Sequence, residues 1–319
     1  MGNIDGQTIG QMKRYLRELQ VKKQLIAVDD MRQWELIRKK RKKILKKCLN
    51  VSRKNTSPKL ELKWAENPEG VNEFFINDED VCLTGGFAEP PAAKNKAPVI
   101  VLLHGKGNNG RDAVLNWRDF LLPAGFGVIG LDLRCHGRRA EDADQAAQVS
   151  QLLGFPMAGL IVSDVLRLID AIPLFPKFDR QKIAIAGFSM GGRYAFQSAV
   201  LDDRIQGCAA LISVTTMREM IFQSQLLKGL HNYSPGLLAC LDFDDMLPML
   251  APRRFMALNG SADLAVPARG TEQCMERMRK IYRLYNAEDN LMQRDYPVAH
   301  TVTGPMKEDV ACWFAQWLQ

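Results

Sequence analysis

Residues 187–192 (GFSMGG) place a serine between glycines, directly after the apolar run 183–186. The spacing matches GxSxG, in which small residues two before and two after the serine allow a very sharp strand-to-helix turn. Such a turn exposes the hydroxyl of Ser189, and the backbone N–H of Met190 at the helix N-terminus is then available to stabilise an oxyanion. We predict that Ser189 is a nucleophile; a glycine-rich turn without chemistry is the alternative.

A serine hydroxyl needs a base, normally a histidine that is oriented by a carboxylate. In chains with this turn the order is serine, acid, histidine. His300 is the histidine that follows both Ser189 and an acid at a strand end, and that acid is Asp263, which follows the run 254–258. Asp289 and Asp295 are weaker rivals, because neither follows a buried strand into a loop. The four histidines of the chain are His104, His136, His231 and His300.

The loop 104–110 (HGKGNNG) follows the apolar run 98–103 and has the composition of an oxyanion loop. Its glycines let backbone N–H groups point inward, and we predict the N–H of Lys106 as the second oxyanion donor. His104 is expected to hold the loop through side-chain hydrogen bonds. A dinucleotide site is disfavoured, because the glycine spacing of this loop is not followed by the rest of the dinucleotide pattern.

Short apolar runs recur from residue 98 onward and are mostly separated by amphipathic segments, which predicts a mostly parallel sheet with helices on both faces. Ligands bind such sheets at the carboxyl ends of the strands, where the residues above fall. Strand-like pieces near residues 60–64, 73–76 and 81–83 predict an antiparallel edge. The runs are 98–103, 127–133, 182–186, 208–214, 254–258 and 291–296.

Four segments together resemble the α/β-hydrolase superfamily, and within it the acetyl-xylan-esterase-like and dienelactone-hydrolase-like esterases: LLHGKG, LDLRCHGRR, FDRQKIAIAGFSMGGRYAF and MLAPRRFMALNGSADLAVP. The resemblance covers roughly residues 98–319. It implies an α/β-hydrolase fold, the triad Ser189, Asp263 and His300, and neither a metal nor an organic cofactor. Arg134 and His136 lie in LDLRCHGRR and are candidates for the rim of the substrate site; structural ion pairing is the alternative for Arg134.

Residues 1–57 are predicted to form a basic helical extension, and residues 58–319 the catalytic domain. Asp29 and Asp30 offer an N-cap, and an apolar stripe continues through the basic run 38–43, so a helix packed on the protein is favoured over a polyanion-binding or nuclear-localisation patch. WELIRKKRKKILKKCL is also similar to the N-terminal extension of some acetyl-xylan-esterase-like members. The apolar, methionine-bearing segment 215–250 is predicted to be either a lid or pocket wall, or a helix covering the sheet.

Bulk composition is that of an ordinary globular protein, with 46% hydrophobic and 25% charged residues among 319. Neither a membrane span nor a signal-peptide hydrophobic region is expected, so we predict a soluble, cytoplasmic protein. The seven cysteines are scattered and lack CxxC spacing, which favours reduced thiols over disulfides or zinc. The net charge of +7 arises mostly at the front, and nucleic acid is an unlikely partner.

The expected function is hydrolysis of a small-molecule carboxylic ester through an acyl-enzyme; an acetyl-like acyl group is implied by the resemblance alone. Peptide or lactone hydrolysis on the same triad is an alternative, because acyl-transfer chemistry is shared. A polyanion-binding protein with an inert hydrolase domain is the alternative from another class. The alcohol part of the substrate and the oligomeric state have no sequence signal.

Overall fold

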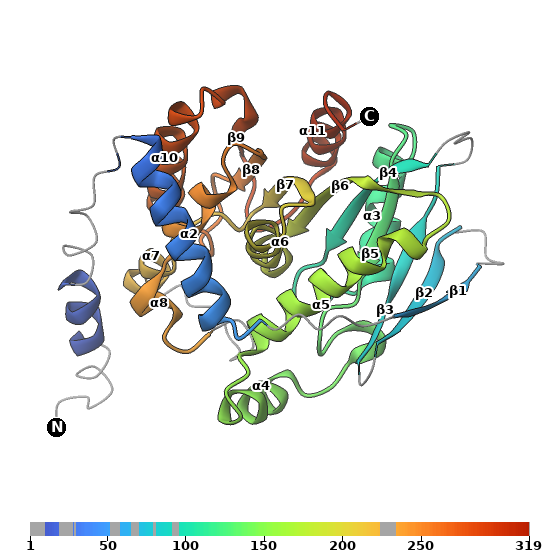
Figure 1. Cartoon of the computed structure of the whole chain (residues 1–319), viewed down its shortest axis with the longest axis horizontal. Helices are drawn as coiled ribbons and strands as arrows, with labels where there is room; N and C mark the ends of the chain where they lie inside the picture. The colour runs from blue at the N-terminus through green and yellow to red at the C-terminus, as the bar shows by residue number, and fades with distance from the viewer. Residues whose placement is uncertain are drawn as a thin grey trace.

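The computed structural model describes residues 10–18, 28, 30–51, 58–64, 70–78, 81–90, 96–223 and 234–318 (Figure 1). Its described strands form one sheet in the order β1-β2-β3-β5-β4-β6-β7-β8-β9. The pairs β1–β2, β2–β3 and β3–β5 are antiparallel, and the pairs from β5–β4 to β8–β9 are parallel. This is the predicted arrangement of a parallel sheet with an antiparallel edge. The strands are β1 (Lys59–Lys63), β2 (Asn72–Asp78), β3 (Val81–Ala88), β4 (Ala97–Leu103), β5 (Gly127–Leu131), β6 (Phe178–Phe188), β7 (Ile205–Leu211), β8 (Arg254–Gly260) and β9 (Leu291–Tyr296).

Helices cover both faces of the sheet (Figure 1). Residues 10–18 are helical, and short 3-10 turns lie at Gly137–Arg139, Ile172–Leu174, Leu247–Leu250 and Glu288–Asn290. The α-helices are α2 (Met31–Cys48), α3 (Gly110–Leu121), α4 (Ala143–Leu152), α5 (Met157–Ala171), α6 (Met190–Leu201), α7 (Met217–Phe222), α8 (Leu237–Cys240), α9 (Phe243–Met246), α10 (Ala268–Leu284) and α11 (Gly304–Ala315).

Alternation along the central strands builds two hydrophobic cores, one on each face. On β4, Val99 and Val101 belong to the core under α5 and α6, whereas Ile100 and Leu102 belong to the core under α3 and α11. Successive side chains of a strand point to opposite faces, and a parallel strand covered on both faces can be apolar throughout. The apolar runs in the sequence therefore mark strands buried on both sides.

Several of the predicted strands have wrong boundaries: the strand expected at 127–133 ends at Leu131, and the strand expected at 254–258 continues to Gly260. The strand expected at 208–214 is β7 and ends at Leu211, because Ile212 adopts a φ of 49° and takes the chain out of the sheet. The strand expected at 182–186 begins earlier, at Phe178, and a register shift between Ile183 and Ala184 interrupts its pairing with β7. The first half of β6 is mostly polar, so the apolar run did not show where the strand begins.

Helix α2 packs on the protein through the predicted apolar stripe. Asp30 caps it, accepting a hydrogen bond from Gln33 N at 2.8 Å, and Trp34 and Leu45 are buried. Three side chains of the basic run 38–43 bind the body of the protein, and the other three are exposed. The bonds run from Arg38 to Met249 O, from Arg41 to Asp245 and from Lys42 to Asp203. Asp29 lies outside the described residues.

The described parts of segment 215–250 are helical and largely buried. Helices α7 and α9 contact α10, and the turn Leu247–Leu250 contacts α6. Asp242 joins residues 234–250 to residues 215–223, since its carboxylate accepts from Met217 N at 2.8 Å and binds Arg218 at 3.0 Å. These parts pack against other helices, α6 and α10; residues 224–233, which include His231, lie outside the described residues.

Within the described ranges, no single helix is long and apolar enough to cross a membrane. One pair of helical segments, Ala143–Leu152 and Met157–Leu174, meets the length and composition test together but is bent by 97°. All seven cysteines are free thiols. The same described ranges hold no group of three or more His, Cys, Asp or Glu side chains arranged to bind a metal.

Candidate active site

Ser189 lies in the tight turn between β6 and α6. Its backbone has φ 53° and ψ −114°, a left-handed conformation that costs a non-glycine residue roughly 1–3 kcal/mol. The turn brings backbone segments very close together: a Cβ on Gly187 would lie 2.3 Å from Gly191 O, and a Cβ on Gly191 would lie 2.1 Å from Leu103 O. The glycines two before and two after the serine are therefore required by space, as the sequence pattern predicts.

The side chains of Ser189, His300 and Asp263 form a hydrogen-bonded chain. Ser189 Oγ lies 2.8 Å from His300 Nε2, and His300 Nδ1 lies 2.6 Å from Asp263 Oδ2. The Asp263 side chain is 1% exposed and that of His300 is 35% exposed, so the carboxylate is shielded while the imidazole faces the solvent side. The structure thus brings together the three residues that the sequence selected from three different strand ends.

Asp263 is held in place from its other side. Its Oδ1 accepts from Ala265 N at 2.8 Å, which leaves Oδ2 for the histidine. The ring of Phe188, the residue before the nucleophile, lies 5.5 Å from the His300 ring and supports it from beside. Both rivals for the acid role lie elsewhere: Asp295 is on the exposed surface of β9, and Asp289 is in the turn before that strand.

The loop between β4 and α3 is fixed by side chains of the strand-end segments beside it. His104 Nε2 accepts from Leu133 N at 3.1 Å, so Nδ1 carries the proton and donates to Gly105 O at 2.7 Å. Desolvation by burial lowers the pKa of His104 to about 4, which keeps the ring neutral near pH 7. The holding role predicted for His104 is what its hydrogen bonds perform.

Asp132, which the sequence reasoning missed, anchors the same loop. Its buried carboxylate accepts from Gly110 N at 2.7 Å and from Thr84 Oγ1 at 2.7 Å, and so joins the start of α3 to β3. Its position directly after the apolar run of β5 was the available signal, because strand-end carboxylates of parallel sheets gather at one edge.

The two predicted oxyanion donors lie on segments next to the nucleophile turn. Met190 is the first residue of α6, where backbone N–H groups have no partner within the helix. Lys106 lies in the turn that is closed by the bond from Asn108 N to Gly105 O at 3.3 Å, and its side chain is exposed. The two N–H groups thus come from the helix after β6 and from the loop after the neighbouring strand β4.

The two candidate rim residues have different surroundings. Arg134 binds Asp164 with both Nε, at 2.8 Å, and Nη2, at 3.0 Å, and Asp164 is almost fully buried. That bidentate pair is the structural alternative foreseen for Arg134. The His136 ring lies 5.1 Å from the His104 ring, and its Nδ1 is 2.8 Å from Arg134 O, which places it beside the oxyanion loop.

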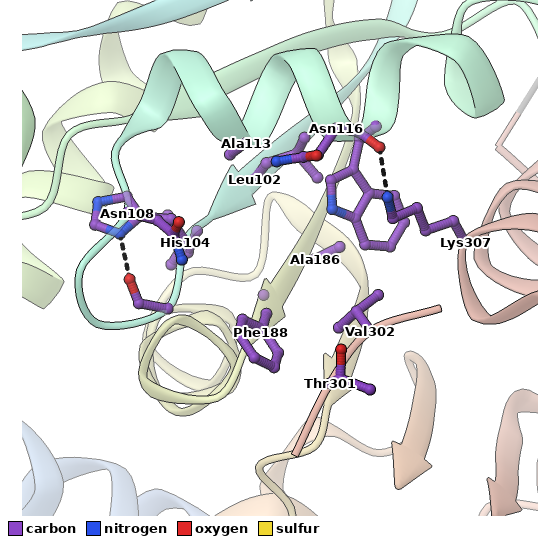
Figure 2. Close-up of a pocket in the computed structure, with 14 residues that line it drawn as sticks. Leu102, His104, Asn108, Ala113, Asn116, Ala186, Phe188, Thr301, Val302 and Lys307 are labelled. Atoms are coloured by element: carbon purple, nitrogen blue, oxygen red, sulfur yellow. Dashed lines mark hydrogen bonds between the residues drawn. The ribbon is translucent and has the colours of Figure 1, made fainter. Parts of the chain in front are cut away.

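A pocket of about 230 Å³ opens beside the nucleophile turn, between α3, α11 and the ends of β4 and β6 (Figure 2). Figure 2 shows Asn116 on α3, Phe188 and Ala186 on β6, and Lys307 on α11 around it. Its wall reaches the triad, since it includes the two residues before Ser189 and the residue after His300. The lining residues are Leu102, Leu103, His104, Gly105, Asn108, Ala113, Asn116, Trp117, Ala186, Gly187, Phe188, Thr301, Val302 and Lys307.

Several solved structures that are similar to this chain are named as esterases. An acetyl xylan esterase of Bacteroides fragilis NCTC 9343, so named provisionally, has a TM-score of 0.73 at 15% identity over 91% of this chain and 89% of its own. The glucuronoyl esterase of Solibacter usitatus has a TM-score of 0.69 at 16% identity over 91% and 94%. Methylesterase BT1017 has a TM-score of 0.69 at 20% identity over 97% and 68%.

The chain has the α/β-hydrolase fold.

Sequence comparisons agree with this α/β-hydrolase assignment. Residues 83–226 match the model of the dienelactone hydrolase family. YtaP of Bacillus subtilis (strain 168), a provisionally named hydrolase, is 25% identical over 246 residues, which are 73% of this chain and 82% of that protein. The matched segment contains the nucleophile turn and the oxyanion loop. The resemblance inferred from sequence motifs is thereby confirmed.

The sequence reasoning also missed the residues that give this chain its side pocket. Asn116 and Trp117 lie on α3, and Lys307 lies on α11, 191 residues after Asn116. Trp117 is 8% exposed. An amphipathic helix predicts that such residues face the sheet, but not which neighbours they meet there.

Proposed function

We propose that the protein is a serine hydrolase that cleaves carboxylic esters through an acyl-enzyme intermediate. The observation that carries the proposal is the chain of hydrogen bonds from Ser189 through His300 to Asp263, at 2.8 Å and 2.6 Å. Both distances lie within the range in which a base can take a proton from a nucleophile and be oriented by a carboxylate. The strained backbone of the turn at Ser189 supports the same assignment.

In the first half-reaction Ser189 Oγ attacks the ester carbonyl carbon while its proton passes to His300 Nε2. The negative charge that develops on the carbonyl oxygen is stabilised by the N–H groups of Lys106 and Met190, each worth about 10²- to 10³-fold in turnover. The protonated His300 then gives its proton to the departing alcohol oxygen as the C–O bond breaks. Asp263 holds the imidazole in the tautomer with hydrogen on Nδ1 and stabilises its charged form.

In the second half-reaction water replaces the alcohol. His300 takes one proton from the attacking water, the tetrahedral intermediate forms on the same two N–H groups, and the proton returns to Ser189 Oγ as the acid product leaves. The products are one carboxylic acid and one alcohol. The Arg134–Asp164 pair positions the loop after β5 and takes no part in proton transfer.

A short acyl group attached to a carbohydrate is the substrate class we propose. The named activities of the structural neighbours, acetyl xylan esterase and glucuronoyl esterase, support it, as does the small volume of the pocket next to the triad, about 230 Å³. Lactone hydrolysis is a second candidate, because residues 83–226 match the dienelactone hydrolase family. A lactone is an internal ester, so the same steps apply with the alcohol retained on the acyl group.

Labelling with a fluorophosphonate probe tests the nucleophile. The folded wild-type protein should form one adduct, which peptide mass spectrometry should place on Ser189, and Ser189→Ala should form none. The matched control is Ser163→Ala, because Ser163 is a buried serine that bonds to Gly159 O within α5. Absence of an adduct on folded wild-type protein would refute the assignment.

Turnover across p-nitrophenyl esters of increasing chain length, beside lactones and peptide amides, tests the substrate class. We expect the highest kcat/KM with acetyl or propionyl esters and none with peptide amides. A preference for lactones would favour the second candidate, and amide cleavage would favour a peptidase. Binding of a polyanion without any hydrolysis would favour a polyanion-binding protein with an inert hydrolase domain. The affinity for the polyanion should then fall steeply with salt concentration.

A further inference from the structure

The pocket between α3 and α11 contains one cation and no carboxylate. Its two titratable lining residues are His104 and Lys307, and burial keeps His104 neutral near pH 7. The other lining residues are uncharged, so the pocket carries a net positive charge. We name it the Trp117 pocket after the large buried side chain in its wall.

Lys307 lacks a counter-ion among the residues that the structure describes. Its Nζ donates to Asn116 O at 2.8 Å and lies 5.3 Å above the Phe120 ring, and no carboxylate oxygen of the described ranges comes within 4.0 Å of it. Desolvation lowers the pKa of Lys307, and Asp119 offsets this in part, although Asp119 is 78% exposed and pairs with Arg118 at 3.4 Å. A partly desolvated ammonium with a neutral partner retains two donors for a ligand.

The remaining lining supplies an apolar wall and further hydrogen-bonding groups. Trp117 and Phe188 offer aromatic surface beside the apolar Val302, whereas Asn108 and Thr301 are exposed polar residues. Figure 2 shows Phe188 and Thr301 on one side of the cavity, opposite Asn116 on α3, with Lys307 at the α11 end. An apolar lining with a few placed polar groups is typical of a small-molecule subsite.

The pocket borders the nucleophile turn. Among its lining residues, Gly187 and Phe188 directly precede Ser189, Thr301 follows His300, and Gly105 lies in the predicted oxyanion loop. We therefore expect a substituent of a substrate held on Ser189 to reach it. With a volume of about 230 Å³, the pocket suits a compact group of a few heavy atoms.

We propose that the Trp117 pocket is a specificity subsite for a carboxylate-bearing substituent of the ester substrate, with Lys307 as the recognising cation. The inference rests on the proposed ester hydrolysis. The apolar stem of the substituent lies against Trp117 and Val302, and its carboxylate accepts from Lys307 Nζ. Recognition of this kind requires one negative charge on the substrate besides the ester that is cleaved.

Matched substrates test the charge. The p-nitrophenyl monoester of succinic acid is compared with the p-nitrophenyl ester of pentanoic acid, and 4-acetoxybenzoate with 4-methylphenyl acetate. Each pair has similar size and differs by one carboxylate, on the acyl side or on the alcohol side. The wild-type enzyme should favour the charged member of one pair in kcat/KM by roughly ten- to hundredfold, the value of one hydrogen bond to a charged group. Equal kcat/KM within both pairs would overturn the proposal.

Variants separate the effect of the Lys307 charge from an effect on folding. Lys307→Gln should remove the preference, and Lys307→Arg should restore most of it. Lys96→Met is the matched control, because it removes an equal charge just before β4, at the end of the strand remote from the pocket, and should keep the preference. Loss of the preference in Lys96→Met as well would show that net charge, not the pocket, selects the substrate.

A binding experiment distinguishes failure of this inference from failure of the ester hydrolysis. Succinate and benzoate are titrated into Ser189→Ala by calorimetry, with Lys307→Gln in the same background. Binding that weakens at least tenfold in the double variant supports the subsite even if no ester is hydrolysed, in which case the proposed function alone is wrong. Hydrolysis of neutral esters without binding of either carboxylate would leave the function standing and overturn the subsite.

Discussion

Replacement of Gly191 by alanine should strongly reduce turnover. Gly191 lies two residues after the nucleophile, at the start of α6, where the helix passes the end of β4. An alanine Cβ there would lie 2.1 Å from Leu103 O, 2.5 Å from Leu103 C and 2.6 Å from His104 O. All three contacts are with backbone, which has no rotamer by which to move away.

The magnitude follows from the distances. Ordinary contact with a Cβ begins at 3.4 Å, so α6 and the end of β4 must separate by at least about 1.3 Å. Met190 belongs to one of these elements and Lys106 follows the other, so the separation widens the gap between the two proposed oxyanion donors. A misplacement of about 1 Å costs roughly 10²-fold in turnover. The overpacking itself should lower the free energy of unfolding by about 1–3 kcal/mol.

Hydrolysis of p-nitrophenyl acetate and urea denaturation measure the two effects on the same samples. Gly304→Ala is the matched control, because Gly304 begins α11 and a Cβ there meets no heavy atom within 4 Å. The control should match wild type in both measurements. Wild-type turnover and stability in Gly191→Ala would refute the argument that the nucleophile turn requires glycine for space.

Three further predictions concern charged or titratable groups. Asp263→Asn should fold normally and lose roughly 10⁴-fold in kcat, because the amide sets the wrong tautomer of His300; an unchanged kcat would return the acid role to Asp289 or Asp295. Burial lowers the folded-state pKa of His104 to about 4 from 6.5, so below pH 6.5 the unfolded chain binds more protons than the folded chain. The free energy of unfolding should therefore fall by roughly 3 kcal/mol between pH 6.5 and pH 4. Urea denaturation at a series of pH values should show this decrease, and His104→Gln should lack it. Asp244→Asn removes one partner of the buried ion pairs with Arg218, at 2.6 Å, and Arg277, at 3.2 Å, and should lower the free energy of unfolding by roughly 3–5 kcal/mol. Asp203→Asn, which removes one partner of an exposed pair with Lys42, should lower it by at most about 1 kcal/mol. Equal losses in urea denaturation would contradict the role of burial.

Sequence patterns predicted the parts of this protein that local physics determines. Strands buried on both faces must be apolar, so β4 and β8 were recognisable, and β9 was predicted with its observed bounds, 291–296. The nucleophile turn was recognisable because only glycine fits where Gly187 and Gly191 lie. Asp263 and His300 followed from strand ends, since parallel strands deliver their next residues to a single edge.

Features that depend on pairing between distant elements were not predictable in this way. Arg41 appears as one more cation in a basic run, and only the packing of α2 shows that it binds Asp245 at 2.9 Å. Lys307 and Trp117 each resemble ordinary helix residues until α3 and α11 lie side by side. The start of β6 was missed because its first residues are polar and a register shift interrupts its pairing. Contacts between elements that are distant in the chain leave no pattern in a single sequence.

The oxyanion loop shows why the site depends on its neighbours more than on its own residues. Glycines at 105, 107 and 110 leave that loop little intrinsic rigidity, yet it must keep a backbone N–H aimed at a developing charge. Rigidity comes instead from buried groups outside the loop or at its base: Asp132 grips Gly110 N, and His104 links Leu133 N to Gly105 O. Because Asp132 also accepts from Thr84 on β3, the loop's position is tied to the antiparallel edge of the sheet. The strands β1 to β3 therefore contribute to the geometry of the site through β3, although none of the residues proposed for catalysis lies on them.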